Sequence, residues 1–199
     1  MNKLLLVILA ISTLSFTSDN NEHFATVEKI SNVPIFVFSK PVAEYEIVGK
    51  AMSFNDMIKM ITDEKSTVRQ KAEKIVKSAR KRVKDEKISN FDGLIIELDK
   101  DKVHAIKFKS DVSTNAKIDN YDDNTAIFFF CEPDEEYEIV EQLEADYSLR
   151  AARNGMLFDK IRSMVDRTIK KQKNGEIKSF DAIIISPDDL SEKLIIFKK

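Results

Sequence analysis

Short apolar runs alternate with polar, turn-rich segments along this chain, and each run predicts a β-strand because it is rich in β-branched and aromatic residues. Most runs are apolar on consecutive positions, which is typical of strands that are buried on both faces. Eight strands are predicted, at residues 33–38, 45–51, 91–98, 103–109, 126–130, 137–143, 180–186 and 194–198.

A helix is predicted between the second and third strand of each half, where apolar residues recur at helical spacing. We expect the first helix to follow Ser66 as its N-cap, and the second to pass through residues 157–165. The apolar stripe of the first helix is Val68, Ala72, Ile75, Val76, Ala79 and Val83. Its other faces carry Arg69, Lys71, Lys74, Lys77, Arg80, Lys81, Arg82 and Lys84.

Two stretches of sequence also occur twice, in the same order. Residues 33–48 return in similar form as 125–140, and residues 89–96 return as 178–185. We therefore predict an α+β protein of two tandem repeated ββαββ modules, each a small sheet with one long helix, packed together. One helix covers only one face of its sheet, so we expect the partner module to cover the other face.

The N-terminal residues have the pattern of an export signal. Lys3 gives a positive start, and residues 4–14 form an apolar core too short for the roughly 20 residues of a membrane-spanning helix. The predicted organisation is a signal peptide at 1–18, a first module at 24–110, a linker at 111–124 and a second module at 125–199.

Charge adds little to this picture. The net charge of −2 gives no case for nucleic-acid binding. Residues 22–110 hold 18 basic and 14 acidic residues, whereas residues 111–199 hold 13 and 19. The basic first helix would suit an anionic surface or polymer, but its counterpart in the second half is mixed. We therefore interpret it as a solvated helix face.

Metal donors are scarce. His23, His104 and Cys131 do not lie at ligand spacing, so we predict no metal site and no cofactor. Cys131 corresponds to Ser39 in the first half, and we interpret it as a free buried thiol. Two other groups of metal-binding residue types are given structural interpretations. We interpret Met52, Met57 and Met60 as core packing. We interpret Asp119, Asp122 and Asp123 as part of a solvated linker.

Catalytic motifs with a nucleophile or a phosphate-binding loop do not occur, and we predict no catalytic residue. One acidic set is repeated and would offer two carboxylates for acid–base chemistry. We interpret its strand members as an outward polar edge and its aspartates as partners of nearby backbone N–H groups. The set comprises Glu44, Tyr45, Glu46 and Asp92, and Glu136, Tyr137, Glu138 and Asp181.

The order of these motifs resembles the small bacterial YbjQ-like family. The likeness lies in a Tyr-x-Ile-Val-Gly strand at residues 45–49, a crossover with a basic helix, and the Phe-Asp-Gly-Leu-Ile-Ile strand at 91–96. The stretches Asn90-Phe-Asp-Gly93 and Ser179-Phe-Asp-Ala182 stand where that family has a Gly-Ala-Asp-Ala-type turn. The resemblance implies α+β modules that assemble into rings, and a heavy-metal-binding label that the scarce donors do not support.

The Pro-x-x-Glu-Tyr-Glu-Ile-Val stretch also resembles exported bacterial proteins of unknown function. We expect a non-enzymatic binding or scaffolding protein of the cell envelope, located in the periplasm or outside the cell. The alternative is an envelope hydrolase whose carboxylates have no recognisable motif. The ligand-binding residues are unknown. We expect the partner to be an envelope protein or polymer, and we expect no nucleic-acid partner and no membrane span. The sequence leaves both a monomer and a homo-oligomer as alternatives.

Overall fold

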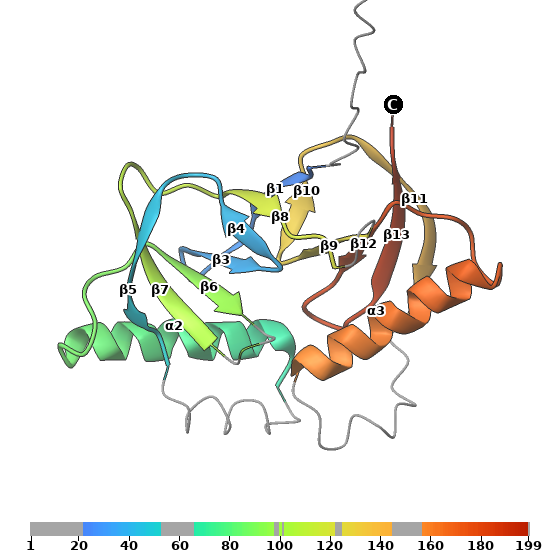
Figure 1. Ribbon diagram of the computed structural model, residues 1–199. Helices are drawn as coiled ribbons and strands as arrows, with labels where there is room; N and C mark the ends of the chain where they lie inside the picture. The colour runs from blue at the N-terminus through green and yellow to red at the C-terminus, as the bar shows by residue number, and fades with distance from the viewer. Residues whose placement is uncertain are drawn as a thin grey trace, which may run out of the picture.

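The computed structural model describes residues 22–52, 66–97, 100, 102–121, 125–144 and 157–198, and it is a mixed α+β fold, as predicted (Figure 1). The predicted signal peptide lies outside these residues. The first half contains β1 (Phe24–Val27), β2 (Lys29–Ile30), β3 (Val33–Val37), β4 (Ser39–Pro41), β5 (Tyr45–Lys50), α2 (Val68–Lys84), β6 (Gly93–Glu97) and β7 (Lys102–Phe108). The second half contains β8 (Asn115–Ile118), β9 (Ala126–Phe129), β10 (Cys131–Pro133), β11 (Tyr137–Leu143), α3 (Leu157–Lys173), β12 (Ala182–Ile185) and β13 (Glu192–Phe197).

One large sheet runs through both halves of the molecule, in the order β11-β13-β12-β9-β3-β6-β7-β5, with β2 added beside β3. At its centre β3 and β9 are antiparallel, with Val37 opposite Phe129. On each side of this junction the next strand is parallel and the following pairs are antiparallel. The two edge strands, β5 and β11, each carry a register shift, between Ile47 and Gly49 and between Ile139 and Glu141.

A second, four-stranded sheet has the order β10-β1-β8-β4. In it β1 of the first half pairs with β10 of the second, and β8 of the second half pairs with β4 of the first. The two halves therefore exchange their leading strands. The segment 111–124, expected to be a linker, contains β8 and belongs to this sheet. The strand was not predicted because the segment is polar and only two of the four residues of β8, Ala116 and Ile118, are buried.

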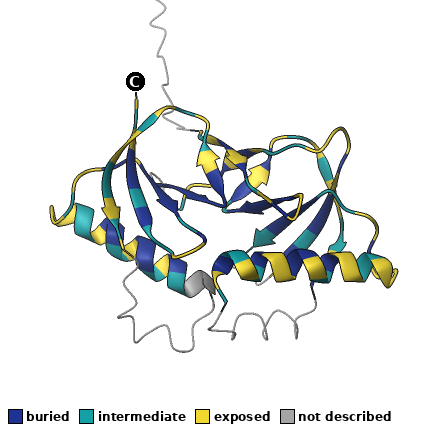
Figure 2. Cartoon of the chain, turned by 180° about the vertical axis from the view of Figure 1, so that it is seen from behind, coloured by how far each residue is buried: buried dark blue, intermediate teal, exposed yellow. Residues whose placement is uncertain are grey.

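Both faces of the large sheet are buried, but the second cover is not the one we expected. The two helices pack on one face, against residues such as Ile35 and Val37, and the small sheet packs on the other, against Phe36 and Phe128 (Figures 1 and 2). The large-sheet strands of the partner half therefore join edge to edge and do not cover the face. The small sheet covers it with strands drawn from both halves.

The chain passes from the large sheet to the small one at two equivalent phenylalanines. Phe38 and Phe130 have φ angles of 53° and 60°, in the left-handed region that a bulky residue rarely adopts. Glycine would relieve this strain, but it would remove the rings that pack against Phe129 at centroid distances of 6.4 and 4.9 Å. The phenylalanines of the predicted strands contribute to the core: Phe36, Phe128, Phe130 and Phe180 are buried, and Phe38 and Phe91 are partly buried.

Helix α2 begins one residue later than predicted. Its N-cap is Thr67 and not Ser66, because the Thr67 side chain accepts a hydrogen bond from the backbone N–H of Gln70, and the Gln70 side chain accepts one from the N–H of Thr67. Among the described residues, no helix has the length and apolar character needed to cross a membrane.

Candidate functional site

A pocket of about 180 Å³ opens where the start of α2 meets the second half of the chain. Its lining is mixed, with charged side chains such as Arg69 and Lys193 beside apolar ones such as Phe130 and Ile184. It is lined by Glu28, Arg69, Phe130, Cys131, Glu132, Ile184, Ile185, Ser186, Pro187, Asp188, Ser191 and Lys193.

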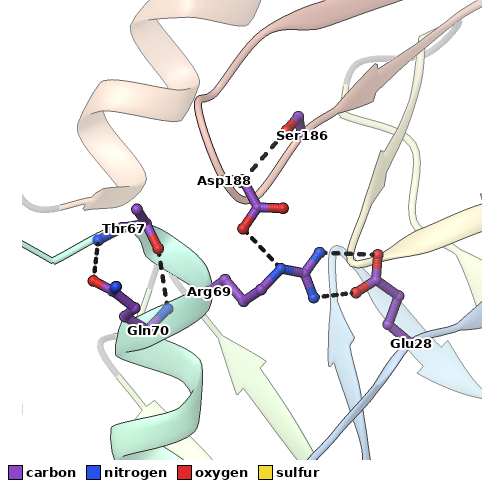
Figure 3. A network of polar contacts seen from close by, with 6 residues as sticks. All are labelled: Glu28, Thr67, Arg69, Gln70, Ser186 and Asp188. Atoms are coloured by element: carbon purple, nitrogen blue, oxygen red, sulfur yellow. Dashed lines mark hydrogen bonds and ion pairs between the residues drawn. The ribbon is translucent and has the colours of Figure 1, made fainter.

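Arg69 of α2 lies between two carboxylates of this pocket (Figure 3). Its Nη1 and Nη2 donate to the two oxygens of Glu28 at 2.7 and 3.4 Å, and its Nε donates to Oδ1 of Asp188 at 2.8 Å. Its backbone N–H donates to the carbonyl oxygen of Pro187 at 3.1 Å. The guanidinium carbon also lies 6.0 Å from the ring centroid of Phe130. One side chain thus joins the β1–β2 connection, α2 and the β12–β13 loop.

The local sequence fixes this arginine in place. The capping box of Thr67 and Gln70 defines the first turn of α2, and Arg69 is the second residue of that turn. This first turn contains no acidic residue of its own to complement the helix dipole. Glu28 and Asp188 supply that negative charge from two other elements.

The Arg69 guanidinium and the Cys131 thiol of the pocket both keep their protons at neutral pH. The hydrogen bond to Glu28 is the largest cause that raises the pKa of Arg69 above its already high usual value. Burial raises the pKa of the Cys131 thiol to about 12, so the thiol is protonated at neutral pH and is a poor nucleophile. The prediction of a buried free thiol at Cys131 is confirmed.

Among the described residues, the most deeply buried carboxyl group lies outside the pocket. Glu192 of β13 is 5% exposed, and its Oε2 accepts a hydrogen bond from Oγ1 of Thr168 on α3 at 2.6 Å. Its Oε1 has no hydrogen-bond partner among the described residues. Burial raises the pKa of Glu192, against the opposing effect of the Thr168 hydrogen bond. The corresponding positions in the first half are Val103 and Ala79, so this pair replaces an apolar contact.

The repeated acidic residues behave as structural groups and do not converge on a site. Asp92 accepts a hydrogen bond from the backbone N–H of Phe108 at 3.1 Å, and Asp181 accepts one from Phe197 at 3.0 Å. The predicted backbone role of both aspartates is confirmed. Their companions at the strand starts lie at the surface: Glu44, Glu46, Glu136 and Glu138 are exposed, and Tyr45 and Tyr137 are partly buried.

The scattered metal donors also remain apart. Among the described residues, no group of three or more histidine, cysteine, aspartate or glutamate side chains could hold a metal ion. His23 contacts Glu135 at 3.1 Å, and His104 contacts Glu97 at 3.1 Å. Met52 is buried and Asp119 pairs with Lys40. Met57, Met60, Asp122 and Asp123 lie outside the described residues.

The pocket residues were not predicted from the sequence. Arg69 was one of eight basic residues on a helix, and nothing near it in the chain marks Glu28 or Asp188 as its partners. One signal was present: 89 residues after Arg69, the spacing between the two similar stretches, the chain has Phe158, so the two halves differ in residue type there. They differ in the same way at Val103 and Glu192. Comparison of the chain with protein-family models, curated proteins and solved structures gives no match.

Proposed function

We propose that this chain is an exported, non-enzymatic binding or scaffolding protein of the bacterial cell envelope, and that it arose by tandem duplication of a ββαββ module. The repeated sequence stretches support the duplication, as does the equal strand order on both sides of the β3–β9 junction. The apolar N-terminal stretch after Lys3 supports export.

The observation that carries the non-enzymatic assignment is the pairing of charges in the pocket. A hydrolase that uses two carboxylates needs one to give a proton and one to accept a proton or attack the substrate. Here Arg69 occupies the space between Glu28 and Asp188 and binds both. The third pocket carboxylate, Glu132, accepts a hydrogen bond from the Tyr137 hydroxyl at 3.1 Å. These contacts suit a rigid surface that holds its shape.

Incubation with insoluble cell-wall material tests this proposal against the hydrolase alternative. We expect the purified protein to sediment with the envelope fraction and to release no soluble fragments that mass spectrometry detects. Soluble products that disappear with the Glu28→Gln or Asp188→Asn variant would replace the proposal with the hydrolase.

Export has its own test. We expect the intact mass of the protein from its native host to correspond to a chain that begins between Phe16 and Asn20. A mass that retains Met1 would remove the envelope location from the proposal.

A further inference from the structure

The outward face of α2 carries a line of four lysines. Lys74, Lys77, Lys81 and Lys84 follow one another at intervals of three, four and three residues, so they share one face of the helix. All four are exposed. The buried face, opposite to them, consists of Val68, Ala72, Ile75, Val76 and Ala79. The four residues are called the lysine stripe below.

Neighbouring side chains leave most of this charge uncompensated. Among the described residues, no acidic side chain forms an ion pair with Lys77, Lys81 or Lys84. Within α2 the only acidic residue is Glu73. Lys81 and Lys84 lie in the last turn, where they complement the helix dipole, whereas Lys74 and Lys77 have no such role and like charges at this spacing disfavour a helix.

The equivalent helix shows that the fold does not require the stripe. At the corresponding positions α3 has Ser163, Asp166, Lys170 and Lys173. Asp166 there accepts a hydrogen bond from the Tyr121 hydroxyl at 2.9 Å and lies 3.9 Å from Arg162.

The stripe lies in a helix layer that is positive as a whole. The two helices form one layer on the same side of the large sheet (Figures 1 and 2). Helix α2 has eight basic residues and one acidic residue, and α3 has six and two. Outside the two helices, the described residues include 12 basic and 22 acidic residues. Within the described residues, positive charge is therefore concentrated in the helix layer.

The chemistry of the face identifies the kind of partner. Every exposed residue of α2 is polar, so the face has no aromatic ring for base stacking and no apolar side chain for insertion into a bilayer. The lysines of the stripe do not line the pocket, so they offer a row of charges with no groove for a polymer strand. From Lys74 to Lys84 the row is about 15 Å long. Such a row matches a plane of negative charges.

We propose that the lysine stripe docks the protein on anionic lipid headgroups at a membrane surface. The inference rests on the proposed envelope function, because an envelope protein meets such a surface. Lysine ammonium groups are attracted to the surface potential of anionic lipids without penetration of the bilayer. The small sheet, on the opposite face of the large sheet, then points away from the membrane.

Vesicle co-sedimentation of the purified full chain tests the proposal. We expect binding at low salt to vesicles of two parts phosphatidylcholine to one part phosphatidylglycerol, no binding to pure phosphatidylcholine, and release at molar salt. Replacing the stripe with glutamine (Lys74→Gln, Lys77→Gln, Lys81→Gln and Lys84→Gln) should weaken binding by at least about tenfold. Glutamine keeps a similar helix propensity, and unchanged circular dichroism would show that α2 is intact.

A matched control changes the net charge equally but away from the helix layer. The exposed lysines Lys40, Lys109, Lys117 and Lys198, replaced together by glutamine, should leave vesicle binding within about twofold of wild type. Equal losses in the two variants would overturn the assignment, because overall charge would then explain binding. Binding to heparin without binding to vesicles would also overturn it and indicate an anionic polymer. None of these failures creates the soluble fragments that would refute the proposed function.

Discussion

Arg69 is a cross-link between segments that are 41 and 119 residues away in the sequence. Its side chain is 31% exposed, so water screens the contacts only partly. We expect Arg69→Ala to lower the free energy of unfolding by about 1–3 kcal/mol, because two carboxylates lose their donor at once. Urea denaturation followed by circular dichroism measures this change.

Two variants separate geometry from charge at this position. Arg69→Lys keeps the positive charge but loses the fork that binds Glu28 and Asp188, so it should recover only part of the loss. Arg162→Ala removes an exposed arginine whose Nε is 3.9 Å from Asp166, and it should change stability by less than about 0.5 kcal/mol. A loss at Arg162 equal to that at Arg69 would contradict the cross-link.

Glu192 should make stability depend on pH. Its pKa is raised in the folded protein, so the folded state holds the proton more tightly than the unfolded chain, whose value is near 4.5. Stability is therefore full below that value and is lost as pH rises through the folded pKa. We expect Glu192→Gln to be more stable than wild type by roughly 1 kcal/mol at alkaline pH and to differ little in acid. Thermal melts across pH measure the difference, and a constant difference at every pH would refute the assignment.

The hydrogen-bonding role of a single residue could be predicted from the sequence where its partner lies on the next strand of the chain. Asp92 and Asp181 were predicted correctly because each meets the backbone of the strand that follows. Arg69 was not predicted, since its partners belong to connections whose positions depend on the whole fold. A local pattern contains no information about such contacts.

Helix capping provides a prediction at the scale of the element. Thr67→Ala removes one half of the capping box and should lower stability by about 1 kcal/mol. Ser66→Ala, at the neighbouring position that the sequence suggested, should cost less than about 0.5 kcal/mol, since Ser66 is not part of the capping box and the bond that its hydroxyl accepts from Lys74 is exposed. The two midpoints in urea decide between them, and the reverse order would restore Ser66 as the cap.

The long strands and both helices were predictable because their apolar residues are numerous enough to show a period. The strands of the small sheet were not. β4 and β10 are three residues each, and β1 and β8 are four residues each with only two buried. Such short segments show too little alternation to stand out from a polar connection. The missing sheet is also why the second cover of the large sheet was assigned to the partner module.

At the scale of the whole molecule, the exchange of strands makes each half incomplete. A fragment that ends at Ser110 retains β1 and β4 but lacks β8 and β10, which pair with them. It also exposes the edge of β3 that pairs with β9. We expect this fragment to aggregate, self-associate or fail to fold. Size-exclusion chromatography with light scattering measures this, and a stable monomer with a dispersed amide spectrum would refute it.

The strand exchange also sets the time at which the chain can fold. β1 is made first, yet its partners are residues 115–117 and 131–133, so roughly the first two-thirds of the chain must be synthesised before β1 has both of them. Contacts so distant in sequence are slow to form, because a long loop must close before they contribute any stability. The small sheet of a nascent chain therefore stays incomplete until most of the chain has been made. That delay is compatible with the export that we propose, in which the chain passes through a narrow translocation channel before it folds.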